Sequence, residues 1–281
     1  MPLVPFPAPL PVTDGARLAA WEEPGALRVA DDAVPLSSAR SLRPPTCRLA
    51  ATDGRRLALD CGDGDLRLRE LRDDIETTPS GTAAIRFDLR RNFSANNGPI
   101  FIIDGLGSRL MGLRFDGKGG TLDLRYDLAT GARVGPFLLG PTQLPSLDVE
   151  SGIVRLCAPL RITRHREKQV YTDEVIHVAD VHAFAGSRLL LRHGGEMRLS
   201  SCGRKGHRVL GRSTQMRPVL TRRYAAWATI ERVFVYGLRS GALRSFAVGK
   251  PSLPNRDRVK LAGTDRRLWI KDGVGVRVLD L

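Results

Sequence analysis

The stretch RVFVYGLRSGALRSF, residues 232–246, decides the fold, because apolar residues alternate along it until Arg-Ser-Gly ends the alternation. The stretch TLDLRYDLATGARVGPF, residues 121–137, keeps a tyrosine, a leucine and a glycine at the same spacing. The final VGVRVLDL repeats the first part of this frame. Alternation with a period of two indicates β-strands. We expect Gly131 and Gly241 to adopt a positive φ in the turns that follow.

Seven short segments share one form, in which a turn residue or two and a basic residue precede an apolar strand. They are TDGARLAAW (13–21), TDGRRLALD (52–60), LGSRLMGL (106–113), ESGIVRLC (150–157), AGSRLLLR (185–192), TRRYAAWA (221–228) and AGTDRRLWI (262–270). A second alternating strand follows most of them. Repeats of about 40 residues with several short strands are typical of a β-propeller, in which each blade is a four-stranded sheet.

We therefore predict an all-β fold, a single β-propeller domain of seven blades over residues 1–281. The chain ends at a third strand, so the N-terminal MPLVPFP is expected to supply the outer strand of the last blade, an edge where proline is tolerated. The third unit is longer than the others because of residues 85–107, which we expect to form an insertion loop. Such a loop either binds a partner or is an insertion that the surface tolerates.

The segments RYAAWATIERVFVYGLRSGALRSF and RRLWIKDGVGVRVLDL resemble the blades of bacterial TolB-type and WD-repeat-like propellers. Those blades run from an apolar strand through a turn to VYDL-x-TG and an outer strand. The resemblance extends over most of the chain. It implies the propeller architecture, but no activity, because one fold supports many functions.

The positive charge of the chain lies in one half. The formal net charge is +14, and residues 1–140 hold 18 basic and 18 acidic side chains, whereas residues 141–281 hold 26 and 12. This asymmetry indicates either a surface for an anionic partner or a bias of composition. On the first interpretation we predict a basic binding patch in turn-rich stretches of adjacent units, made of Arg164, His165, Arg166, Arg204, Lys205 and His207.

Cys47 and Cys61 flank RLAATDGRRLALD, two alternating runs around an Asp-Gly turn. This pattern predicts a hairpin in which the two cysteines face each other on antiparallel strands. We therefore predict a disulfide between them, with a pair of buried free thiols as the alternative. The four cysteines of the chain have no CxxC spacing that would indicate a zinc site.

No catalytic motif is recognisable, and we predict no catalytic residue, no metal and no cofactor. His177 and His182 are five residues apart, and residues at that spacing on a strand point to opposite faces. The carboxylate pairs Glu22-Glu23 and Asp31-Asp32 neighbour turns, where solvation is their simplest role. The basic residues are not interleaved with aromatic ones as in a single-stranded nucleic-acid platform.

The leading functional hypothesis is a non-enzymatic binding module or scaffold, expected to be a monomer. It would present loops and a central opening to a protein or polysaccharide partner, which could be anionic. The alternative is a propeller enzyme, a hydrolase or lyase, with acidic or histidine residues in the axial pocket. The location stays open: the sequence as written shows no export signal, whereas the cysteine pair and the resemblance favour an exported protein. No apolar run is long enough for a transmembrane helix.

Overall fold

Short antiparallel strands make up most of the computed structural model. Besides them, the described residues contain helix α1 (Thr82–Phe93) and a 3₁₀ turn at Leu36–Ser38. No helix in this part of the chain is long and apolar enough to cross a membrane. The structure describes residues 3–62, 65–93, 101–106, 110–117, 120–133, 168–171, 174–177, 181–185, 188–193, 195–201, 207–213, 218–249 and 259–281.

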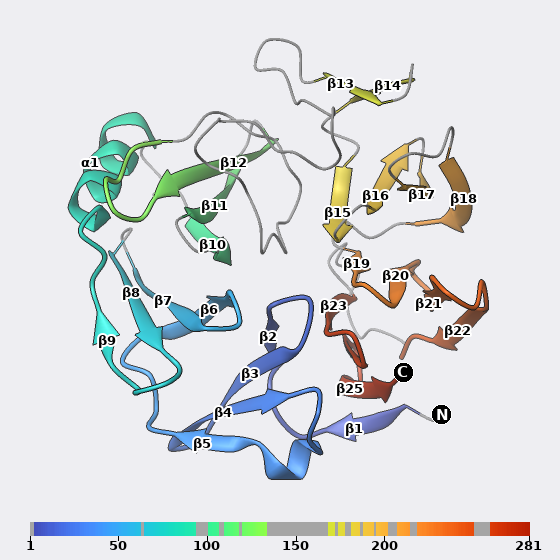
Figure 1. Cartoon of the computed structure of the whole chain (residues 1–281), viewed down its shortest axis with the longest axis horizontal. Coiled ribbons are helices and arrows are strands. Elements are labelled where there is room, and N and C mark those ends of the chain that lie inside the picture. Colours follow the sequence, from blue (N-terminus) through green and yellow to red (C-terminus); the bar gives the residue numbers. More distant parts are fainter. Residues whose placement is uncertain are drawn as a thin grey trace.

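The strands of the described residues form seven sheets, named here in chain order (Figure 1). The first sheet has β2 (Val12–Thr13), β3 (Leu18–Glu23), β4 (Ala26–Asp31) and β5 (Arg40–Leu42), and the second has β6 (Arg48–Thr52), β7 (Arg56–Gly62), β8 (Asp65–Glu70) and β9 (Glu76–Thr77). The third has β10 (Phe101–Leu106), β11 (Leu110–Gly117) and β12 (Gly120–Asp127), and the fourth has β13 (Lys168–Tyr171) and β14 (Glu174–His177).

The other three sheets each have four strands. The fifth has β15 (Val181–Ala185), β16 (Arg188–His193), β17 (Glu196–Ser201) and β18 (His207–Arg212), and the sixth has β19 (Val219–Leu220), β20 (Tyr224–Ala228), β21 (Arg232–Gly237) and β22 (Leu243–Ala247). The last sheet has β23 (Lys260–Gly263), β24 (Arg267–Asp272), β25 (Gly275–Asp280) and, from the other end of the chain, β1 (Val4–Phe6).

The sheets lie around a common centre, with β2, β6, β10, β15, β19 and β23 nearest to it (Figure 1). These inner strands also connect neighbouring sheets. Strand β2 contacts β6 and β23, β6 contacts β10, and β19 contacts β15 and β23. The fifth sheet therefore contacts the sixth, and the sixth contacts the last. The last sheet contacts the first, which contacts the second, and the second contacts the third.

The hydrophobic core lies between the sheets. Strand β20, YAAWA, is buried along its whole length. Its Ala225 and Trp227 pack with the fifth sheet, whereas Tyr224, Ala226 and Ala228 pack with the last sheet. Because side chains alternate between the two faces of a strand, one strand contributes to two cores. This explains why the second strand of a unit reads as continuously apolar.

The N-terminal segment completes the last sheet, as the sequence predicted. Val4, Pro5 and Phe6 pair antiparallel with residues 276–278 of β25. Pro5 lies on the outer strand of the sheet, where its missing N–H costs no ladder hydrogen bond. Phe6 packs edge-to-face against Trp21 of the first sheet and Trp269 of the last, with ring centroids 5.2 and 6.3 Å apart. The segment thus joins the two ends of the chain in one core.

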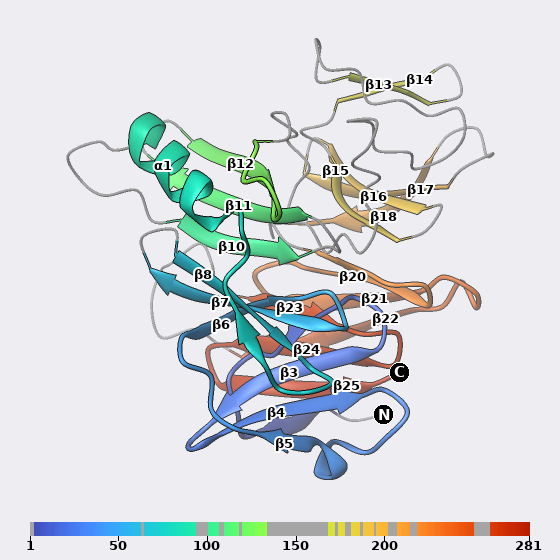
Figure 2. The ribbon, with the colours of Figure 1, turned by 60° about the vertical axis from the view of Figure 1, so that its left-hand side comes forward.

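The prediction of an insertion loop over residues 85–107 is wrong, because α1 and β10 occupy most of this segment. Ile85 and Leu89, four residues apart, lie on one face of α1 and are 0% and 4% exposed. They pack into the core of the second and third sheets, and Figure 2 shows α1 beside β8 and β12. Residues at this spacing share a helix face, and their burial stabilises the helix against the two sheets.

Two local predictions agree with the structure. Gly131 and Gly241 have φ values of 71° and 69°. Cys47 and Cys61 form a disulfide, with their Cα atoms 4.9 Å apart. The adjacent residues Arg48 and Asp60 pair across β6 and β7, so the bridge extends that ladder. Cys157 and Cys202 lie outside the described residues.

Replacing Cys47 and Cys61 together by serine is expected to lower the free energy of unfolding by about 3 kcal/mol, because the bridge closes a short loop in the unfolded chain. The sequence separation that sets this loop is 14 residues. Urea unfolding with and without a reducing agent measures the effect. A reductant should destabilise the natural chain and leave the double variant unchanged; equal stability of both chains without reductant would contradict the prediction.

Candidate functional site

Capped turns precede the second strands of the first and sixth sheets. Asp14 Oδ1 accepts the backbone N–H groups of residues 16–18 at 2.8–2.9 Å. Thr221 Oγ1 accepts two N–H groups of the residues that follow it, both at 3.1 Å. Caps of this kind hold a tight turn in place. Each turn presents an exposed arginine, Arg17 in the first sheet and Arg223 in the sixth.

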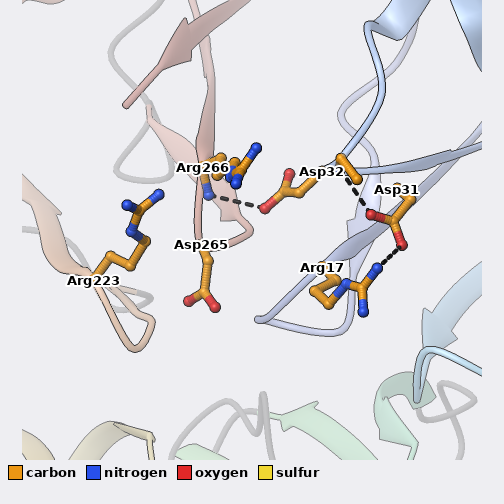
Figure 3. A pocket seen from close by; sticks show the side chains of 7 residues that line it. Arg17, Asp31, Asp32, Arg223, Asp265 and Arg266 are labelled. Carbon is orange, nitrogen blue, oxygen red and sulfur yellow. Dashed lines mark hydrogen bonds and ion pairs between the residues drawn. The ribbon is translucent and has the colours of Figure 1, made fainter.

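Two pockets that share Arg223 and Asp265 form a groove across these turns. The smaller pocket, of about 200 Å³, has Arg223, Ser240, Ala242 and Arg244 among its lining residues. The groove is therefore lined by residues of the first, last and sixth sheets. The larger pocket, of about 340 Å³, is lined by Arg17, Asp31, Asp32, Ala33, Arg223, Asp265 and Arg266 (Figure 3).

Two arginines of the groove make no hydrogen bond or ion pair through their side chains with another described residue. Arg17 Nη2 lies 2.8 Å from Asp31 Oδ2, so these two charges are paired. The side chains of Arg223 and Arg266 are exposed and make no hydrogen bond or ion pair with another described residue. Asp265, which lies between Arg223 and Arg17 in Figure 3, accepts the N–H of Arg222 at 3.0 Å through one oxygen. Two guanidinium groups therefore remain available to acceptors on a ligand.

The two adjacent carboxylates of the larger pocket have different surroundings. Burial acts to raise the pKa of Asp31, but the N–H of Ala33 and the guanidinium of Arg17 outweigh it and lower this pKa. Burial raises the pKa of Asp32 in spite of its hydrogen bonds to Thr264 and the Arg266 N–H. Within the described residues, no three His, Cys, Asp or Glu side chains come together in a way that could hold a metal ion.

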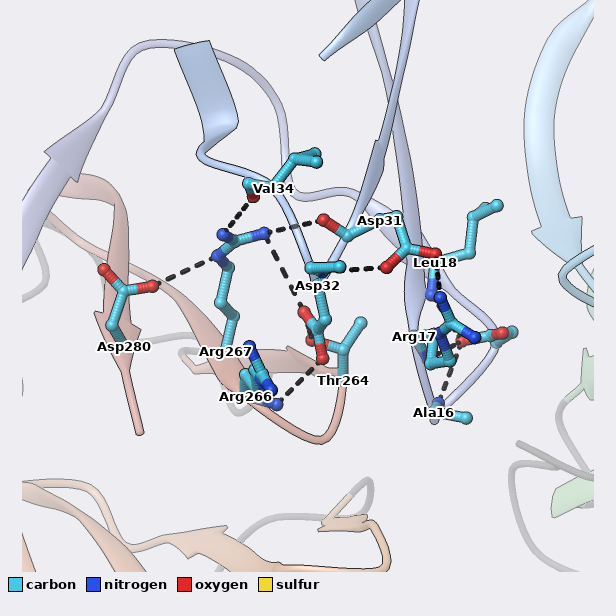
Figure 4. A network of polar contacts seen from close by, with 12 residues as sticks. Ala16, Arg17, Leu18, Asp31, Asp32, Val34, Thr264, Arg266, Arg267 and Asp280 are labelled. Atoms are coloured by element: carbon cyan, nitrogen blue, oxygen red, sulfur yellow. Dashed lines mark hydrogen bonds and ion pairs between the residues drawn. The ribbon is translucent and has the colours of Figure 1, made fainter. Parts of the chain in front are cut away.

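Asp32 belongs to a polar network at the seam between the first and last sheets (Figure 4). Its two oxygens accept the Thr264 hydroxyl at 2.5 Å and the Arg266 N–H at 2.9 Å. The Arg267 guanidinium lies 3.8 Å from Asp32 and donates to the backbone carbonyl of Val34 at 2.5 Å. Asp32 is 6% exposed, so the expectation of a solvated Asp31-Asp32 pair is wrong for Asp32.

The seam network continues into the sixth sheet. The Tyr224 hydroxyl donates to the backbone carbonyl of Arg267 at 2.7 Å. Burial raises the pKa of Tyr224, and the hydroxyl therefore stays protonated as a donor. The N–H of Asp265 donates to the Ala16 carbonyl at 2.6 Å. Hydrogen bonds between the first, last and sixth sheets therefore hold the residues of the groove in place.

Most of the predicted basic patch falls on residues whose structure is not described. Arg164, His165, Arg166, Arg204 and Lys205 lie outside the described residues. The remaining member, His207, begins β18 and is exposed, and its Nε2 lies 2.9 Å from Nη1 of Arg198. Strand β18 is the outermost strand of the fifth sheet (Figure 1), so His207 is not part of the groove. The patch stays a prediction.

The sequence contained a signal for the groove that the patch prediction did not use. Arg17, Arg223 and Arg267 occupy the same place in three of the repeated segments, directly before or at the start of the second strand. The structure gives them different roles. Arg17 forms a surface ion pair, Arg223 is open to solvent, and Arg267 is 8% exposed within the seam. The repeated arginine therefore indicated where the groove lies. The contacts with neighbouring sheets determine whether each arginine is paired, exposed or buried.

No protein-family model matches the chain, and no curated protein matches it. Many solved structures are similar to the chain, including the following two. One is an AfRom2 CNH domain, with 11% sequence identity, a TM-score of 0.42, and coverage of 98% of this chain and 94% of that one. The other is Hsv2 of Kluyveromyces lactis, with 10% identity, a TM-score of 0.38, and coverage of 96% and 72%.

Proposed function

We propose that the chain is a seven-bladed β-propeller of the TolB-type and WD-repeat-like kind. Three observations support this architecture. The described strands form seven sheets. Shared cores connect each sheet from the fifth to the last with the next one, and the last sheet with the first. Strand β1 supplies the outer strand of the last sheet, so that both ends of the chain lie in one sheet, as in a propeller whose ring is closed by its terminal strands.

The function that the geometry supports best is a non-enzymatic binding module that holds a partner carrying acidic groups. The observation that carries this proposal is the pair of exposed guanidinium groups of Arg223 and Arg266 in one groove, neither of which makes a hydrogen bond or ion pair with another described residue. Arginine binds carboxylates through two parallel hydrogen bonds, which gives direction as well as charge. Because the groove crosses three sheets, it can contact several groups along an acidic protein segment or polysaccharide.

Replacing Arg223 and Arg266 together by alanine is expected to weaken the binding of an acidic polymer at least about tenfold, because two charge-assisted contacts are lost. Poly-L-glutamate and oligogalacturonate are suitable probes of the two partner classes, measured by calorimetry. Binding to the natural chain should also weaken as salt is raised.

The matched control is the double replacement of Arg72 and Lys271 by alanine. Both side chains are exposed, and neither lines the groove, so this variant loses the same charge elsewhere. Equal weakening in both double variants would mean that net charge alone attracts the probe. An unchanged affinity of the Arg223 and Arg266 variant would remove the groove as the binding site.

A hydrolase is the second candidate, because opposite pKa shifts of Asp31 and Asp32 in one pocket are typical of an acid and base pair. Both oxygens of Asp32 already accept internal hydrogen bonds, which favours a structural role and the binding module. The test is the release of reducing ends from oligogalacturonate. Release that Asp32→Asn abolishes, while the affinity for the oligosaccharide persists, would favour the enzyme.

The disulfide supports an oxidising compartment as the place of action, since such bridges persist outside the reducing cytosol.

A further inference from the structure

The outward face of α1 has an unusual composition for a surface. Phe87 is 66% exposed and is the one aromatic residue among the large, exposed apolar side chains of the described residues. Arg90 and Arg91 follow it by three and four positions, and Ala83 and Ala84 precede it by four and three. All five side chains are exposed, and positions at these spacings lie on one side of a helix. Phe87 is therefore central, with two arginines on one side and small residues on the other.

The inward face of α1 fixes the helix firmly to the third sheet. The buried hydroxyl of Tyr126 donates to Asp88 Oδ2 at 2.6 Å, and burial together with Asp88 raises the pKa of Tyr126, which keeps this donor protonated. Gly81, just before the helix, donates its N–H to the Leu128 carbonyl at 3.0 Å. The Ser80 hydroxyl donates to the Ala129 carbonyl at 2.7 Å. The outward face is thus presented by a preorganised helix, which lowers the entropy cost of binding.

Helix stability accounts for only part of this composition. Arg90 and Arg91 lie in the last turn of α1, where positive charge interacts favourably with the helix dipole. Neither arginine makes an ion pair with another described residue. The dipole does not explain the exposed ring of Phe87. The ring is not needed for the core either, because Ile85 and Leu89 supply the contacts of α1 to it. An exposed aromatic residue beside two arginines has the composition that is enriched at protein interfaces.

We propose that the outward face of α1, made of Ala83, Ala84, Phe87, Arg90 and Arg91, is a docking surface for an acidic protein partner. Phe87 inserts between apolar side chains of the partner, while Arg90 and Arg91 bind carboxylates around them. The surface lies on the third sheet and does not include the groove, so it is a second site. A protein is favoured over an anionic membrane because helices that bind membranes have a continuous apolar stripe, and this face has one large apolar side chain.

The test uses short synthetic helical peptides on the full chain. One peptide carries leucines along one face and glutamates elsewhere; the second has the same composition with the leucines dispersed, and the third has lysines in place of the glutamates. Fluorescence anisotropy should show that the first binds at least about tenfold more tightly than the other two. Phe87→Ala, and separately Arg90→Glu with Arg91→Glu, should each remove at least about tenfold of that affinity.

Two controls make the outcome decisive. Val274→Ala shortens an apolar side chain that is also 66% exposed, and Arg72→Glu with Lys271→Glu reverses two exposed charges away from α1; both should leave the affinity unchanged. The variant sites are exposed, so Phe87→Ala should unfold thermally as the natural chain does, and the charge reversal in the last turn of α1 should lower Tm only slightly. Equal binding of the three peptides, or affinity that survives Phe87→Ala, overturns the proposal. So does Phe87-dependent binding to phosphatidylserine vesicles without preference among the peptides.

Discussion

Gly131→Ala is expected to lower the free energy of unfolding by about 4 kcal/mol, because it combines backbone strain with a clash in a packed junction. Gly131 has a φ of 71°, which side chains disfavour. An added Cβ would also overlap the carbonyl oxygen of Gly81 and lie 2.6 Å from the Cβ of Ala84. Neither contact can relax without moving the start of α1. Urea unfolding followed by circular dichroism measures the loss.

Gly241→Ala is the matched control, since Gly241 occupies the same position of the repeated frame. Its φ is 69°, but the nearest atom to an added Cβ is the Tyr236 hydroxyl at 3.7 Å. Only the conformational cost remains, and the expected loss is about 1 kcal/mol. Equal losses at the two glycines would show that the contact between α1 and the turn contributes nothing.

Asp32→Ala is expected to cost about 3 to 5 kcal/mol of unfolding free energy, as is usual when one partner of a buried charged network is removed. The Thr264 hydroxyl and the Arg266 N–H would lose their acceptor, and the charge of Arg267 would lose its buried carboxylate. The control is Asp280→Ala. Asp280 also contacts Arg267, at 3.1 Å, but its side chain is 66% exposed, so the expected loss is less than about 1 kcal/mol.

The protonation of Asp32 is tested by measuring the free energy of unfolding of the natural chain and of Asp32→Ala as a function of pH. Its pKa is raised by burial, so the folded chain binds this proton more tightly than the unfolded chain does. The resulting stability is fully present below the unfolded value of about 3.9 and is lost as pH rises through the folded value. The stability difference between the natural chain and Asp32→Ala should therefore grow as pH is lowered through this window. A difference that shrinks on acidification would contradict the raised pKa.

The sequence predicted the strands well because their signal is local. In YAAWA and RLWIKD, neighbouring sheets bury both faces of the strand, so each apolar residue is visible in the sequence as core. The hairpin around Asp53-Gly54 likewise specified the position of Cys47 opposite Cys61. Gly131 and Gly241 were predictable for the same reason, since the turn needs a positive φ whatever surrounds it.

Helix α1 and the groove were not predictable, because both depend on residues distant in the sequence. Among the described positions of α1, only the apolar residues Ile85 and Leu89 pack into the core. Two residues are too few to give the sequence a clear helical period. The helix also requires Gly81 to meet Gly131. Asp32 looks solvated in the sequence and becomes buried only because Thr264, 232 positions away, lies beside it.

The pairing of β1 with β25 sets the order of events on the folding pathway. This ladder joins residues near opposite ends of the chain, so its loop-closure entropy is among the largest in the molecule, and contacts of this kind form slowly. Until it forms, β25 keeps an unsatisfied row of backbone donors and acceptors, open to strands of other chains. Concentration during refolding, rather than the stability of any sheet, would then limit the yield of folded protein.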